Sequence, residues 1–192
     1  MNSYLYMLRN IRLGLLAGIL LFAVSACGSS KKATQKKAPQ KTSAKKASTT
    51  KTSVSTVSKR LGFPIAAKDP NMKLYVEASN WIGVPYKSGG TTKKGADCSG
   101  VTQQIYKTVY KKTLHRRSAD MATHDVSNVS KGKLAPGDLV FFATSKKNTI
   151  NHVGIYLKSN YFIHASSKKG VMVSNLNEDY FKKTYKKGGR VK

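Results

Sequence analysis

The hydrophobic pattern of this chain changes twice, and each change marks a different kind of segment. Residues 13–24 form an unbroken apolar run, residues 28–60 hold almost no large apolar side chain, and periodic apolar positions begin near Leu61. Only the last of these segments can bury enough apolar surface to offset the entropy lost when a chain becomes ordered. We therefore expect one folded domain over residues 61–192.

Two main helices are predicted in the first part of this domain. Apolar residues that can share one side recur over Pro70–Trp81, and the Gly-Val-Pro run at 83–85 ends that helix. A second helix should begin at Asp97, a residue suited to the N-cap position, because apolar residues recur at every fourth position after it. The residues between these helices, 87–95, are expected to form a loop, and a short helix is expected over 118–124.

The later part of the domain has the pattern of short strands. From residue 138 onward, runs rich in Val, Ile, Phe and Tyr are separated by Gly, Asn and Ser turns. The expected strands are 138–142, 152–157, 161–164, 171–173 and 189–191, with a last helix over 178–185. Helices followed by a series of strands predict an α+β fold in which N-terminal helices pack on an antiparallel β-sheet.

The N-terminal segment has the features of an export signal. Arg9 and Arg12 precede the apolar run, which at about a dozen residues is short for a membrane span of about 20. The run ends in small residues directly before Cys27, an order similar to the lipobox of bacterial lipoproteins. We predict a lipoprotein signal peptide over residues 1–26 and lipidation of Cys27. An ordinary signal peptide, or a short anchor helix that contains a cysteine, is the alternative.

The charge of the chain is strongly positive, at +27 from 35 Lys and Arg against 8 Asp and Glu. Ten of the basic residues lie within residues 28–60, which contain no acidic and no aromatic residue. We expect residues 27–60 to be a disordered tether, either a passive spacer or a segment that adheres to anionic lipid or wall polymer. Nucleic acid is not an expected partner, because the chain is exported and no aromatic residue interleaves the Lys run for base stacking.

The number of cysteines limits the roles that each of them can have. Two cysteines exclude a disulfide scaffold and a multi-cysteine zinc module, and lipidation of Cys27 would leave Cys98 without a partner. Cys98 would be the first residue of the helix capped by Asp97, where unpaired N–H groups and the helix dipole stabilise a thiolate and lower its pKa. The same N–H groups could hold an oxyanion. A buried, inert cysteine is the alternative.

Two of the four histidines are candidates for partners of this thiol. His152 begins one predicted strand, and His164 lies on the next, so the pair can meet and His164 can orient the ring of His152. His115 and His124 lie among Lys, Arg and Ser and are expected on the surface. A metal site formed by Cys98, His152 and His164 is a weaker alternative, because no paired ligand spacing supports it.

Five short stretches follow one another in a characteristic order along the domain. They are Trp81–Tyr86 followed by Gly89-Gly90, Asp97–Val101, Pro136–Phe142, His152–Tyr156 and Phe162–Ser166. Through these stretches, residues 74–192 resemble the NlpC/P60 family of cell-wall cysteine peptidases. The C-terminal run 171–190 resembles the Spr-like murein endopeptidase lipoprotein branch in particular.

The resemblance implies a papain-like α+β core and a Cys-His-His triad without metal or other cofactor. It assigns the nucleophile to Cys98, the base to His152 and the third member to His164. It implies peptidoglycan as the substrate and an exported monomer held by its lipid, on the outer membrane of a Gram-negative cell or the outer face of a Gram-positive cell membrane. The substrate-groove residues that it implies are Tyr86, Asp97, Ser99 and Arg117.

Other functions stay open at this point. The same Cys and His pair could serve an N-acetylmuramoyl-L-alanine amidase of the CHAP type, and a non-catalytic lipoprotein could use the basic charge to bind the wall. Nor does the sequence say which bond is cut: D-glutamyl-diaminopimelate, a D-alanine to diaminopimelate cross-bridge, or a terminal D-alanine.

Overall fold

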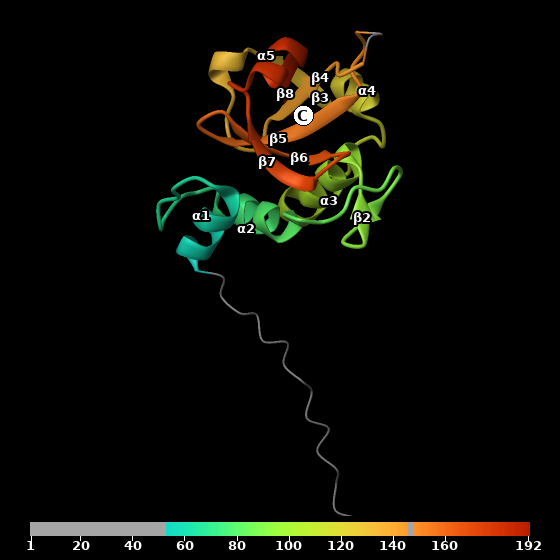
Figure 1. The fold of residues 1–192 in the computed structure, drawn as a ribbon. Coiled ribbons are helices and arrows are strands. Elements are labelled where there is room, and N and C mark those ends of the chain that lie inside the picture. The colour runs from blue at the N-terminus through green and yellow to red at the C-terminus, as the bar shows by residue number, and fades with distance from the viewer. Residues whose placement is uncertain (1–52, 146–147) are drawn as a thin grey trace, which may run out of the picture. The chain divides into compact units, whose positions relative to one another are not determined.

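A computed structural model describes residues 53–145 and 148–192, which form helices and two antiparallel sheets (Figure 1). The predicted signal peptide, Cys27 and the predicted tether up to residue 52 lie outside the described residues. In the two described ranges, no helix combines the length and the apolar character that crossing a bilayer requires.

The folded part begins before the predicted boundary at residue 61. Helix α1 (Val54–Leu61) occupies the end of the segment predicted as tether, and Ser53 caps it by accepting a hydrogen bond from the Thr56 N–H at 3.3 Å. Val57 and Leu61 are almost fully buried. The prediction of a disordered segment is wrong for residues 54–60. Val57 and Leu61 lie four positions apart, on the same face of the helix, and this face packs on the core.

The two predicted main helices are present. Helix α2 (Met72–Trp81) begins two residues after its predicted start, and helix α3 (Cys98–Tyr110) begins directly after Asp97. The expected loop between them contains a small two-stranded sheet, in which β1 (Thr91–Thr92) pairs with β2 (Gly95–Ala96). Strands of two residues carry no readable alternation, so the pattern could not predict them.

A six-stranded antiparallel sheet forms the rest, in the order β3-β8-β4-β5-β6-β7. All five predicted strands are present, but β8 begins four residues before its expected start, and β3 was not predicted because it is a short polar edge strand. The strands are β3 (Val126–Val129), β4 (Leu139–Phe142), β5 (His152–Lys158), β6 (Tyr161–Ser166), β7 (Gly170–Asn175) and β8 (Tyr185–Val191). The short helices are α4 (Ser118–Asp120), the π-helix η1 (Met121–Asp125), the 3₁₀-helix η2 (Lys131–Lys133) and α5 (Asp179–Thr184).

Both faces of the sheet are covered, which explains why β4 is an unbroken apolar run. Leu139 and Phe141 belong to the core shared with α1, α2 and α3, whereas Val140 and Phe142 pack with Phe181 of α5 on the other face. Figure 1 shows α5 on one side of the sheet and these three helices on the other. Helix α3 packs against β5 and β6. This packing brings Cys98, at the start of α3, beside the start of β5.

Candidate active site

The N-terminus of α3 is held by the side chain of Asp97. Its Oδ1 accepts a hydrogen bond from the Gly100 N–H at 2.7 Å, and its Oδ2 accepts one from the Gly89 N–H at 2.8 Å. The second bond ties the loop before the helix to the helix start. Asp97 is therefore the N-cap, as predicted, and Cys98 is the first helical residue, where backbone N–H groups lack helical partners.

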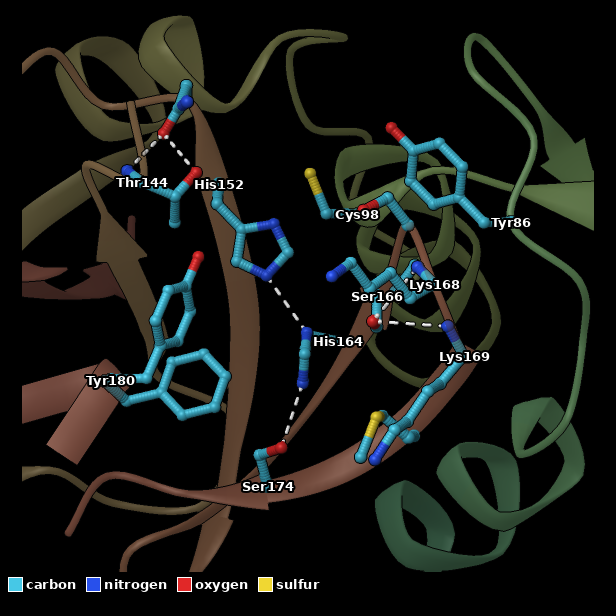
Figure 2. A pocket seen from close by; sticks show the side chains of 15 residues that line it. Tyr86, Cys98, Thr144, His152, His164, Ser166, Lys168, Lys169, Ser174 and Tyr180 are labelled. Carbon is cyan, nitrogen blue, oxygen red and sulfur yellow. Dashed lines mark hydrogen bonds between the residues drawn. The ribbon is translucent and has the colours of Figure 1, made fainter. Parts of the chain in front are cut away.

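Two histidines and a serine form a hydrogen-bonded row across β5, β6 and β7. His152 begins β5, and its Nε2 lies 3.0 Å from Nδ1 of His164 on β6. Nε2 of His164 lies 3.1 Å from Oγ of Ser174 on β7. Figure 2 shows this row, and the other ring nitrogen of His152 lies on the side of Cys98. The predicted meeting of the two histidines is present. Ser174 was not predicted, because nothing in a small polar residue on a strand marks its partner.

Cys98 and the two histidines line one cavity of about 530 Å³ (Figure 2). Cys98 is 9% exposed, and the backbone N–H of Val153, the residue after His152, acts on the pKa of its thiol. The sulfur therefore lies beside the start of strand β5. Tyr86 lies on one side of the cavity and Tyr180 on the other, and both side chains are substantially exposed.

Burial dominates the titration of the thiol and of both imidazoles. Burial raises the pKa of Cys98, although N–H groups of Val153, Ser99 and Cys98 itself act to lower it. The predicted net lowering of this pKa is therefore wrong, because desolvation outweighs the helix terminus. Burial lowers the pKa of His152 to about 4, and burial together with His152 lowers that of His164 to about 3. Near neutral pH the thiol and both imidazoles are uncharged in the free protein.

A second cavity of about 370 Å³ lies on the other side of Cys98 and is lined by Asp97, Ser99 and Arg116. The Arg116 guanidinium donates to both Asp97 oxygens, at 2.6 and 3.0 Å, and to Oγ of Ser99 at 2.7 Å. Burial alone would raise the pKa of Asp97, but the bonds from Arg116, Gly100 and Gly89 lower it overall. The Asp97 carboxylate is thus occupied by the protein's own donors.

Arg117, the arginine predicted for the groove, has a different partner. It contributes to the lining of the second cavity, but its Nε and Nη2 donate to the two oxygens of Asp120 at 2.8 and 2.9 Å, and its side chain is 76% exposed. The contacts with Asp97 and Ser99 beside the thiol are made by Arg116, which was not predicted for the groove. The two arginines are adjacent in a bend before α4, and their side chains have different partners, so the sequence pattern could not choose between them.

The other two histidines lie outside this cavity, as expected. Nδ1 of His115 lies 2.7 Å from Oδ1 of Asp125, and the His124 ring is 5.0 Å from that of His115. Both residues are exposed or partly exposed. Within residues 53–145 and 148–192, no three His, Cys, Asp or Glu side chains are placed to hold a metal ion.

A cysteine at a helix N-terminus, facing a histidine on an antiparallel sheet, is the arrangement of a papain-like α+β protein. Residues 83–190 match the model of the NlpC/P60 family, and the chain belongs to this family. The fold agrees with a crystal structure of an NlpC/P60 family protein from Bacillus cereus, with a TM-score of 0.58 and 32% identity. That match covers 62% of this chain and 39% of the other.

Two bacterial relatives are about 40% identical. One is the murein DD-endopeptidase MepS/murein LD-carboxypeptidase of Escherichia coli K12, at 40% identity over 64% of each chain. The other is a probable endopeptidase NlpC homolog of Haemophilus influenzae, at 42% identity over 59% of this chain and 58% of its own length. The matched part thus spans about three fifths of these relatives.

Proposed function

We propose that this protein is a peptidoglycan hydrolase, a cysteine endopeptidase that cleaves peptide bonds in murein stem peptides or cross-bridges. The observation that carries the proposal is the common cavity of Cys98, His152 and His164, with one imidazole beside the thiol and the second bonded to the first. Membership of the NlpC/P60 family and the names of the relatives support murein as the substrate.

The proposed reaction starts from an uncharged pair. As Cys98 attacks the carbonyl carbon, Nδ1 of His152 takes the thiol proton, and backbone N–H groups at the start of α3 stabilise the oxyanion. Collapse of the tetrahedral intermediate breaks the C–N bond, His152 gives its proton to the leaving amine, and a thioester remains on Cys98. Water, deprotonated by His152, then releases the new carboxylate and restores the thiol. His164 holds the ring of His152 throughout.

The charge of the main cavity suits an acidic peptide. Lys168 and Lys169 line it, no Asp or Glu does, and neither lysine has an ion-pair partner among the described residues. Both lie on the short turn between β6 and β7, where their N–H groups bond to Oγ of Ser166 at 3.3 Å. Stem peptides carry free carboxylates, which two unpaired ammonium groups would attract.

The proposed location follows from residues outside the described ranges. We propose that Cys27 carries lipid after removal of residues 1–26 and that the protein is a monomer anchored at the membrane facing the wall. Growth with a labelled fatty acid should label the wild-type chain and leave Cys27→Ser unlabelled. Equal labelling of both would contradict the lipid anchor without affecting the peptidase proposal.

The peptidase proposal is tested with purified peptidoglycan and mass spectrometry of the products. The wild-type protein should release new amines and shortened or uncrosslinked peptides, Cys98→Ala should release none, and His164→Ala should retain part of the activity. Equal release by wild type and Cys98→Ala would overturn the proposal.

The same spectra separate the alternatives. Intact stem peptides free of sugar would identify an amidase. Binding to peptidoglycan without any product, together with a Cys98 thiol that iodoacetamide does not alkylate, would identify a wall-binding protein. Among peptidase products, the masses of the fragments would identify the bond that is cut.

A further inference from the structure

Ser174 is the last member of the hydrogen-bonded row that begins at His152, and it is buried. It is 6% exposed, its Oγ lies 3.1 Å from Nε2 of His164, and this is its only side-chain hydrogen bond among the described residues. His164 is 4% exposed and packs between the rings of Phe162 and Phe181, at centroid distances of 5.0 and 5.3 Å. Nε2 of His164 therefore has Ser174 as its protein partner, at the wall of the main cavity and beside aromatic rings (Figure 2).

The row restricts where the protons of the two imidazoles can lie. Each neutral imidazole carries one N–H. Only one hydrogen fits between Nε2 of His152 and Nδ1 of His164, so one of these nitrogens donates and the other accepts. If Nδ1 of His152 is to take a proton from Cys98, the His152 hydrogen must sit on Nε2. His164 must then accept at Nδ1, carry its own hydrogen on Nε2 and donate it to a further acceptor. Ser174 Oγ lies 3.1 Å from this Nε2 and can accept that hydrogen; the tautomer of His164 sets the direction of the bond.

We propose that Ser174 is a positioning residue that keeps His164 protonated on Nε2 and thereby keeps Nδ1 of His152 free to act as a base. Without the hydroxyl, the His164 N–H would point at apolar side chains, which is unfavourable for a buried donor. His164 would then favour its hydrogen on Nδ1, and this would force the His152 hydrogen onto Nδ1, facing the thiol. That arrangement has no lone pair to receive the thiol proton. The catalytic consequence rests on the proposed peptidase function, whereas the tautomers do not.

The tautomers can be read directly in the unmodified protein. In full-length protein labelled with ¹⁵N at histidine, long-range ¹H–¹⁵N spectra near neutral pH should show both His152 and His164 protonated on Nε2. Assignment uses His152→Gln and His164→Gln. A wild-type spectrum with His164 protonated on Nδ1 would overturn the proposal without any need for an active enzyme.

The variant Ser174→Ala should lower kcat about 10- to 100-fold, because most molecules would lose the free lone pair that accepts the thiol proton, with KM nearly unchanged. Its His164 signal should move toward the Nδ1-protonated form, and Ser174→Thr, which keeps the hydroxyl, should restore both kcat and the tautomer. Ser79→Ala is the matched control, because Ser79 is fully buried but donates to the Val76 carbonyl away from the cavity. A Ser174→Ala protein with wild-type tautomers and wild-type kcat would overturn the role. If the wild-type protein has both histidines protonated on Nε2 but does not cleave murein, the peptidase function is refuted and the tautomer assignment stands.

Discussion

On one side of Cys98, the hydrogen bonds are made by the charged side chain of Asp97 to residues near it in the sequence. Asp97 bonds to Gly89, Ser99, Gly100 and Arg116, and the farthest of these is 19 positions away. On the other side, His152, His164 and Ser174 come from three strands and are uncharged; His164 and Ser174 are buried and His152 is partly buried. We refer to the first set, Asp97, Ser99 and Arg116, as the helix side, and to the second set, His152, His164 and Ser174, as the strand side.

The difference indicates that the two sides have different roles in the proposed reaction. On the helix side, the paired charges hold the helix start and place the sulfur. On the strand side, low polarity keeps the imidazoles neutral, so that His152 can accept a proton at neutral pH. Changes on the strand side should therefore act mainly on chemistry, and changes on the helix side mainly on position.

The largest expected effect is the loss of the base. His152→Ala should lower kcat/KM on murein by about four orders of magnitude, since His152 is the imidazole beside the thiol and His164 lies behind it. His124→Ala, which removes a histidine outside the cavity, should leave the activity unchanged. Assays of amine release from purified peptidoglycan measure both. A His152→Ala protein with a tenth of wild-type activity would refute the strand side as the source of the base.

The second effect concerns stability and pH. Because burial lowers the pKa of His152 to about 4, while an unfolded histidine titrates near 6.5, the unfolded chain binds more protons as the pH falls below about 6.5. Stability should drop progressively from there toward the folded pKa, by about 2 kcal/mol per histidine between pH 7 and pH 5. Urea unfolding of wild type and His152→Gln at both pH values measures this, and the variant should lose less. Identical pH dependence in both proteins would show that His152 is not buried as a neutral group.

The third effect distinguishes two adjacent arginines on the helix side. Arg116→Ala removes a two-pronged bond to the N-cap carboxylate and should lower kcat/KM about tenfold. Arg117→Ala breaks an ion pair with the partly exposed Asp120 and should change kcat/KM less than about twofold. Parallel assays of kcat/KM compare the two variants directly, because each removes one arginine at neighbouring positions. If Arg117→Ala were the more damaging, the groove would involve the arginine first predicted from the sequence.

The smallest effect is expected at the cavity lysines. The double variant Lys168→Gln/Lys169→Gln should raise KM for stem peptides with free carboxylates about two- to tenfold, with little change for amidated peptides. Lys111→Gln/Lys112→Gln, at the end of α3 and outside both cavities beside Cys98, removes the same charge and is the control. An equal rise in KM for free and amidated peptides would assign the lysines a role other than carboxylate binding.

Much of the local structure was readable from the sequence. Asp97 followed by a four-residue apolar repeat predicted the N-cap and the start of α3, and short apolar runs between turn residues predicted β4 to β7, because both signals are local. Helix α1 was missed because its two buried residues, Val57 and Leu61, lie among Ser, Thr, Lys and Arg residues like those of the segment before it. The pKa of Cys98 was predicted in the wrong direction because the helix terminus is visible in the sequence and burial is not.

By itself, the sequence determined the position of Cys98 at a helix start and of two histidines on successive strands, since capping and strand patterns depend on neighbours along the chain. Only the tertiary structure decided which groups complete each side: Arg116 in place of Arg117 at Asp97, and Ser174 at the end of the histidine row. The reason is physical. Strand register and the direction of a side chain in extended backbone are set by packing across the sheet, between residues that no local pattern connects.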